Sequence, residues 1–286
     1  MYAITGVTGH VGGAAARELL AKGEQVRAVV RDPARGGPWS EAGAEVFTAD
    51  LGDRAALAEA FRGCRGAFVM LPTDPAADDA GHRALAGSIA GAVLDSGVPH
   101  AVMLSSLGAE LAEGTGPIRW LHHLENLLRE TGVLLTAVRS GHFQEKVETV
   151  LDAARGAGVY PVFGDSADTP APMIATRDVG RVAAEALLAP PPSGEVIDLD
   201  APSYTERQVA DELGAVLGRP LQVVTVPRPG WVDTMVEAGL PPQLARELAD
   251  MYDAVDRGVL QPAGDRRLTC PTGIGETLRR LVTPTA

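Results

Sequence analysis

The chain begins with "MYAITGVTGHVGG", residues 1–13, and this stretch decides the fold. A short apolar run at residues 2–5 predicts a strand, and it stops at Gly6, with Gly9 and Gly12 following at three-residue intervals. Apolar side chains then recur at helical spacing. A strand, a glycine turn and a helix in this order bind the pyrophosphate of a dinucleotide, because the glycines permit a tight turn and close approach of the backbone. The predicted phosphate-binding residues are Gly6, Thr8, Gly9, His10, Val11 and Gly12.

The following residues alternate between strand and helix patterns. The strands are almost continuously apolar, which is typical of a parallel sheet covered by helices on both faces. We therefore predict an α/β fold with a Rossmann-type, doubly wound parallel sheet. The predicted strands are residues 2–5, 25–31, 44–53, 66–72, 100–106 and 134–141, and the predicted helices are 11–22, 54–63, 79–97 and 119–132.

The alternation weakens after residue 141. A helix beginning near Asp178 and a strand at 195–200 are expected to return to the sheet, whereas the chain from about 201 is mostly helical with proline-rich links. We predict an NAD(P)-binding domain at 1–150, joined by 175–200, and a smaller, mainly helical substrate-binding lobe at 151–286.

Composition limits the classes of ligand. The 286 residues carry a formal net charge of −12, which argues against binding nucleic acid or an anionic membrane through bulk charge. There is no basic leader and no run of about 18 apolar residues, so we expect a cytoplasmic protein without a membrane segment. Cys64 and Cys270 lack metal-ligand spacing, and we expect neither a metal site nor a disulfide.

The end of the second strand indicates which dinucleotide binds. Arg31 stands where NAD sites usually place an acidic residue, and Arg35 follows four residues later. Guanidinium groups bind a 2′-phosphate well, so we favour NADP(H) over NAD(H), while the adjacent Asp32 leaves NAD open. Other strand ends at the same edge of the sheet supply the remaining predicted cofactor contacts: Asp50, Leu51, Leu71, Pro72 and Ser105.

Six segments together resemble one known family: "TGVTGHVGG" (5–13), "VVRDP" (29–33), "ADLGD" (49–53), "LSSLG" (104–108), "HHLENLLRETGVLLTAVRSGHFQEK" (122–146) and "IATRDVGRVAAEAL" (174–187). In this order they resemble the NmrA-like group of atypical short-chain dehydrogenase/reductases. The resemblance implies an NAD(P)-binding Rossmann domain with a small C-terminal substrate lobe. It also implies either a quinone or natural-product reductase, or a redox sensor that binds cofactor without turnover.

The usual catalytic pair of the superfamily, Tyr-x-x-x-Lys, does not occur. The residues four positions after the four tyrosines are Gly6, Gly164, Gln208 and Asp256. The only lysines are Lys22 and Lys146, and Glu145-Lys146 replaces the Glu-Asn that the family carries after the sixth strand.

Three other residues are candidate catalytic groups. His122 and Glu125 share one face of the helix at 119–132, and His142 follows the last strand of the first domain. Histidine is the natural proton donor near neutral pH, although each of these residues would equally suit a structural position.

These observations favour an NADPH-dependent reductase of a small, apolar, electron-poor substrate, either quinone-like or a natural-product intermediate. Hydride transfer to such an acceptor needs little acid assistance, since the cofactor carries the chemistry. The alternatives are a non-catalytic NADP(H) sensor that signals through a protein partner, and an enzyme that catalyses redox-neutral chemistry on the same fold. The sequence also leaves open whether the protein forms a homodimer. Candidates for an apolar substrate wall, which would equally suit the core, are Trp39, Trp120, Trp231, Phe143 and Met235.

Overall fold

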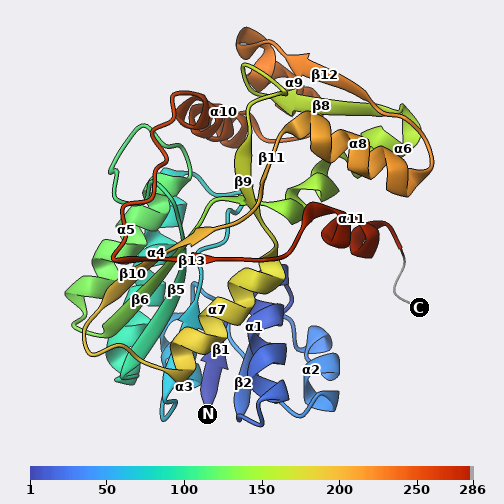
Figure 1. Cartoon of the computed structure of the whole chain (residues 1–286). Coiled ribbons are helices and arrows are strands. Elements are labelled where there is room, and N and C mark those ends of the chain that lie inside the picture. Colours follow the sequence, from blue (N-terminus) through green and yellow to red (C-terminus); the bar gives the residue numbers. More distant parts are fainter. Residues whose placement is uncertain (284–286) are drawn as a thin grey trace.

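An eight-stranded parallel sheet forms the centre of the protein, whose computed structural model describes residues 1–283 (Figure 1). The predicted Rossmann-type fold is confirmed. The chain reverses direction across the sheet between β1 and β4, and this switch point is where such sheets bind ligands. In spatial order the strands are β13 (Arg266–Thr269), β10 (Glu195–Asp200), β6 (Leu134–Ser140), β5 (His100–Ser106), β4 (Gly66–Val69), β1 (Tyr2–Ile4), β2 (Val26–Val30) and β3 (Glu45–Thr48).

Helices cover both faces of the sheet. On one face α1 (His10–Ala21) packs against α7 (Thr176–Leu188), and Gly180 is required there because a Cβ atom would lie 2.5 Å from the Cβ of Ala14. The opposite face carries α3 (Arg54–Phe61), α4 (Asp79–Ser96) and α5 (Ile118–Glu130). Both interfaces are built from small and aliphatic side chains, so the sheet is buried on both sides.

Local signals in the sequence set the helix ends. The side chain of Asp78 accepts a hydrogen bond from the Gly81 amide at the start of α4, and Gly97 ends that helix with a φ of 64°. At the start of α8 (Glu206–Leu217), Thr205 and Gln208 form a reciprocal capping box.

The C-terminal lobe lies beyond the carboxyl ends of the strands (Figure 1). It contains a two-stranded sheet of β8 and β12, and a three-stranded sheet in the order β11, β9, β7 connects it to the main sheet. Its elements are β7 (His142–Phe143), η2 (Gln144–Val150), α6 (Leu151–Gly156), β8 (Val159–Phe163), β9 (Ala171–Ile174), β11 (Ser203–Tyr204), α8 (Glu206–Leu217), β12 (Gln222–Val226), η3 (Arg228–Gly230), α9 (Trp231–Glu237), α10 (Pro242–Asp256) and α11 (Ile274–Val282).

Several features were not predicted, among them the two small sheets of the lobe, because the chain from about residue 201 was expected to be mostly helical. The strand β13 leaves the lobe and adds an eighth strand to the main sheet beside β10, although its "RRLT" sequence has no apolar run. The short elements η1 (Pro33–Arg35) and α2 (Gly37–Glu41) fill the link between β2 and β3. Within residues 1–283, no helix combines the length and the apolar character that crossing a bilayer requires.

Candidate functional site

The glycine turn has the geometry of a phosphate-binding loop. Gly6 has a φ of 63°, which favours glycine, and a Cβ atom on Gly12 would lie 2.4 Å from the carbonyl oxygen of Gly6. Gly9 is the N-cap of α1, and no side chain accepts a hydrogen bond from the first turn of that helix. The free N–H groups and the positive end of the helix dipole therefore face outward, as an anion requires.

The residues predicted around this turn divide by exposure. Thr8, Gly9 and His10 are exposed, whereas Val11 and Gly12 are buried against the sheet. The Nε2 atom of His10 lies 2.9 Å from a carboxylate oxygen of Glu148 in η2, so the loop is joined to the first segment of the lobe.

A cavity of about 440 Å³ opens beside the glycine turn. The turn forms one wall and the η1–α2 link forms the other, where Arg35 and Trp39 lie. Arg17 reaches this cavity from α1: its guanidinium lies 5.5 Å from the Trp39 ring centre and close to Gly13. Residues with side chains larger than glycine at position 13 would meet this guanidinium.

The arginines around this cavity are not neutralised. Within residues 1–283, Arg17, Arg31 and Arg35 have no carboxylate within 4 Å. Arg31 is exposed at the end of β2 but does not line the cavity. Sequence reasoning missed Arg17, although its position four residues after Gly13, on the same face of α1, is a usable signal.

The acidic residues near the predicted adenosine site are engaged in turns. Asp32 accepts a hydrogen bond from the Ala34 amide at 2.9 Å, and Asp50 accepts one from the Gly52 amide at 2.8 Å. Leu51 and Pro72 are half-buried and Leu71 is buried, each at the carboxyl end of its strand or just beyond it. Their predicted contacts with a cofactor remain predictions.

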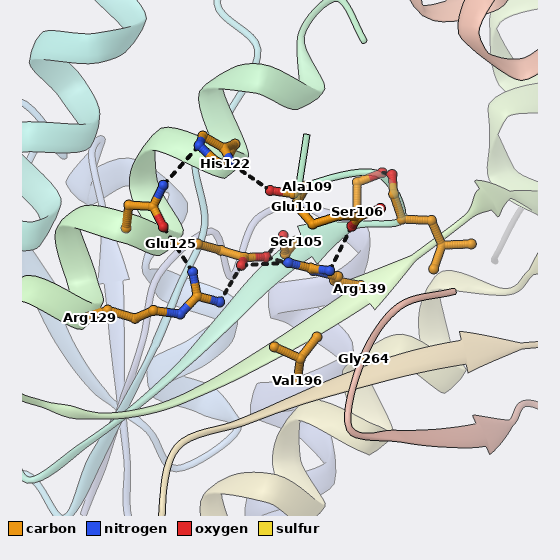
Figure 2. A network of polar contacts seen from close by, with 12 residues as sticks. Ser105, Ser106, Ala109, Glu110, His122, Glu125, Arg129, Arg139, Val196 and Gly264 are labelled. Atoms are coloured by element: carbon orange, nitrogen blue, oxygen red, sulfur yellow. Dashed lines mark hydrogen bonds and ion pairs between the residues drawn. The ribbon is translucent and has the colours of Figure 1, made fainter. Parts of the chain in front are cut away.

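Glu125 lies in a buried network instead of at an open site (Figure 2). Its carboxylate pairs with Arg139 at 2.9 Å and accepts a hydrogen bond from the Ser105 hydroxyl at 2.6 Å. The side chains of Glu125 and Arg139 are 0% and 5% exposed, and Arg129 and Glu110 extend the network. Burial alone would raise the pKa of Glu125, but the hydrogen bonds from Arg139 and Ser105 outweigh it and hold the pKa below its usual range.

This position does not support the catalytic role predicted for Glu125, because a fully buried carboxylate that is already paired cannot touch a substrate. The Ser105 hydroxyl donates its proton in a hydrogen bond to Glu125, so it could only accept a hydrogen bond from a cofactor, and its predicted cofactor contact remains a prediction.

His122 is held by hydrogen bonds at both ring nitrogens (Figure 2). Its Nδ1 lies 2.8 Å from the carbonyl oxygen of Ala109, so Nδ1 carries the proton and donates. Its Nε2 lies 2.9 Å from the amide nitrogen of Asn126 and accepts. Both ring nitrogens of His122 are therefore engaged in hydrogen bonds within the protein, which favours a structural role.

His142 lies just beyond the carboxyl end of β6, on β7. Burial, together with the positive charge of Lys146, lowers the pKa of His142 to about 3. The imidazole is therefore neutral near pH 7 and cannot deliver a proton as an imidazolium.

Four of the five candidates for an apolar substrate wall are buried in the hydrophobic cores: Trp39, Trp120, Trp231 and Met235. The fifth, Phe143, is half-buried.

A second cavity, of about 530 Å³, lies beside α4 and α5. Its arginines are paired: Asp79 accepts hydrogen bonds from Arg83, Arg119 and the indole of Trp120, and Arg119 also pairs with Glu247 of α10. Burial alone would raise the pKa of Asp79, but these hydrogen bonds lower it to about 2. His122 and the exposed Glu113 also line this cavity, and within residues 1–283 Glu113 has no basic group within 4 Å.

The described part of the chain contains no group of three or more histidine, cysteine, aspartate or glutamate residues that could hold a metal ion.

The sheet, its switch point and the glycine turn define a Rossmann-fold protein of the dinucleotide-binding class. Residues 2–264 match the NmrA-like family, and the chain belongs to this family.

Three known proteins are similar to the chain. An NAD(P)H azoreductase of Xenophilus azovorans is 28% identical over 254 residues, covering 88% of this chain and 86% of that protein. A (4-alkanoyl-5-oxo-2,5-dihydrofuran-3-yl)methyl phosphate reductase of Streptomyces griseus is 34% identical over 227 residues, covering 78% and 76%. The structure of an Escherichia coli NADPH-dependent quinone oxidoreductase complexed with NADPH superimposes with a TM-score of 0.81 at 24% identity, covering 99% of this chain and 100% of that one. This last likeness shows the fold.

Proposed function

We propose that the protein is an NADPH-dependent reductase of small, electron-poor, conjugated acceptors. The observation that carries the cofactor choice is the cavity beside the glycine turn, where Arg17 and Arg35 face open space without acidic partners. Relatives that reduce azo compounds, a phosphorylated dihydrofuranone and quinones support the choice of reaction.

The residues of this chain fit a dinucleotide. The free N–H groups at the start of α1 would hold the pyrophosphate, and the absence of a Cβ at Gly12 leaves the loop close enough to the sheet for this. Arg17 and Arg35 would hold a 2′-phosphate through charge-assisted hydrogen bonds, with Arg31 at the rim. Asp32, which could bind the ribose hydroxyls of NADH, has one carboxylate oxygen engaged by the Ala34 amide of its own turn.

When bound, a reduced nicotinamide supplies a hydride ion, that is, two electrons and one proton. A second proton completes the reduction of a quinone to a hydroquinone. His122 has both nitrogens engaged, and His142 is neutral near pH 7. Solvent is therefore the proton source that the geometry supports best. A site of this kind suits acceptors whose reduced anion is already stabilised, and leaves simple ketones and aldehydes nearly unreacted.

The test is a screen of acceptors followed at the absorbance band of NADPH. We expect oxidation of NADPH by quinones, azo dyes and conjugated enones, and almost none by simple ketones. His122→Ala and His142→Ala should each keep kcat within a few-fold of the wild type, since loss of a general acid typically lowers the rate about a hundredfold or more. Efficient turnover of a simple ketone would reveal a catalytic acid and contradict the proposal.

A second candidate function is a non-catalytic NADP(H) sensor. It is favoured by the engagement of Ser105, His122 and Glu125 in structural contacts. Tight binding of NADPH without oxidation by any acceptor of the screen would favour this function, and the search would then turn to a protein partner.

A further inference from the structure

Lys146 is the third residue of η2. Its neighbours are fixed in the interior: the Gln144 amide donates to the carbonyl oxygens of Met173 and Thr272 at 2.9 and 2.8 Å. The Glu145 carboxylate accepts from the Thr176 amide at 2.9 Å. These anchors hold η2 in one position just beyond the carboxyl end of β6. Ligands of doubly wound sheets bind at this edge.

The Lys146 ammonium lies over an aromatic surface of the lobe. Its Nζ atom is 4.3 Å from the ring centre of Tyr252 in α10. That ring stacks on Phe163 of β8 at 5.5 Å and meets Trp231 of α9 edge-on at 6.0 Å. Tyr252 and Phe163 remain partly exposed, so part of this aromatic cluster is open to solvent near the positive charge.

This charge has no acidic partner. Within residues 1–283, no carboxylate lies within 4 Å of Lys146, which is itself half-buried. Four acidic residues close to Lys146 or Tyr252 in the sequence are paired elsewhere: Glu145 with Arg280, Glu148 with His10, and Asp253 and Asp256 with Arg228. The facing His142 imidazole is neutral, so it neither repels nor neutralises the ammonium at neutral pH.

We propose that Lys146 recognises an anionic substituent of the acceptor. The substrate class is then a planar conjugated acceptor that carries a phosphate, sulfonate or carboxylate group, with its ring system on the aromatic surface. This assignment rests on the proposed reductase function. A half-buried lysine whose ammonium has no carboxylate partner is uncommon in a protein with a net charge of −12, and the Tyr252 ring alone does not replace a charged partner.

The test compares a neutral naphthoquinone with its sulfonate derivative in the wild type, Lys146→Gln and Lys146→Arg. Lys146→Gln should lower kcat/KM for the sulfonate about ten- to a hundredfold and for the neutral quinone less than about threefold. Lys146→Arg should retain most of the preference. The control is Lys22→Gln, which removes the other lysine from an exposed pair with Glu18 and should change neither value.

Two outcomes would overturn the proposal. One is an equal fall for both acceptors, and the other is a lowered Tm that accounts for the lost activity, which would make the contact with Tyr252 structural. The dissociation constant of NADPH should be the same in all variants.

A binding titration tests this proposal separately from the reductase function. The binding of the sulfonate is measured by the quenching of tryptophan fluorescence. If NADPH is never oxidised, sulfonate binding that weakens tenfold in Lys146→Gln and not in Lys22→Gln still supports anion recognition. Equal binding by both variants, or no binding, would overturn it.

Discussion

The two cavities described above are both lined by charged side chains, but they differ in how their arginines are partnered. Beside the glycine turn, Arg17 and Arg35 face the cavity without a carboxylate. Beside α4 and α5, Asp79 is bonded to Arg83 and Arg119. Paired charges hold helices in place, whereas unpaired charges of one sign are available to a ligand of the other sign. The same criterion separates Glu125, which is paired and buried, from Lys146.

The largest effect should follow from opening the buried network. Arg139→Met leaves the Glu125 carboxylate buried without its main partner, and we expect the free energy of unfolding to fall by about 3–5 kcal/mol. Denaturant unfolding measures this. The control Arg266→Gln, which breaks an exposed pair with Glu195, should lower it by less than about 1 kcal/mol.

Glu125→Gln provides the matching test of function. The folded fraction of this variant should keep its kcat, because Glu125 acts on stability alone. A stable variant with a greatly reduced kcat would place Glu125 in the catalytic machinery and break the distinction between paired and unpaired charges.

The next effect concerns the glycine turn. Gly12→Ala places a methyl group against the carbonyl oxygen of Gly6, and NADPH should bind about a hundredfold more weakly, or about 3 kcal/mol. Fluorescence titration gives the dissociation constant. Gly87→Ala in α4 is the control, since a Cβ atom at Gly87 meets nothing within 4 Å. Unchanged affinity in Gly12→Ala would mean that the dinucleotide binds elsewhere.

The unpaired arginines should decide between the two dinucleotides. Arg17→Gln and Arg35→Gln should each weaken NADPH binding by about 1.5–3 kcal/mol, roughly ten- to a hundredfold, and leave NADH binding nearly unchanged. Arg31→Gln should have a smaller effect, because Arg31 does not line the cavity. Arg267→Gln is the control for net charge, as this arginine is exposed on β13. Equal affinities of the wild type for NADH and NADPH would refute the assignment.

The last effect is a pH dependence of stability at His142, which is modest per pH unit and accumulates over several units. The pKa of its imidazole is about 3 in the folded protein and close to 6.5 in the unfolded chain. Between these values only the unfolded state takes up the proton, so stability falls as the pH falls, by at most about 1.4 kcal/mol per pH unit. His142→Asn should lose less stability than the wild type when denaturant unfolding is compared from pH 7 to 4, and the two should be equally pH-dependent above pH 7. Identical curves over the whole range would mean that His142 titrates normally.

The sequence predicted the main sheet well because its strands are apolar on both faces and end at turn residues. The strand β13 escaped prediction, since an edge strand with two arginines carries no burial pattern. The glycine turn was predictable from local spacing. The partners of Glu125 and His122 were not, because Arg139 and Ala109 lie on other elements and only the folded chain brings them together. The same is true of Arg17 and Trp39, whose contact joins two sides of one cavity.

The path of the chain through the sheet has a consequence for biosynthesis. Six of the eight strands, β1 to β6, are complete once residue 140 has been made, so the first domain can begin to fold while the ribosome is still translating. The outer edge of β6 must then wait for β10, and the outer edge of β10 for β13, whose last residue is Thr269. Nascent chains whose translation stalls within the lobe therefore expose the unpaired edge of β6 or β10. We expect these chains to be prone to aggregation and to need chaperones.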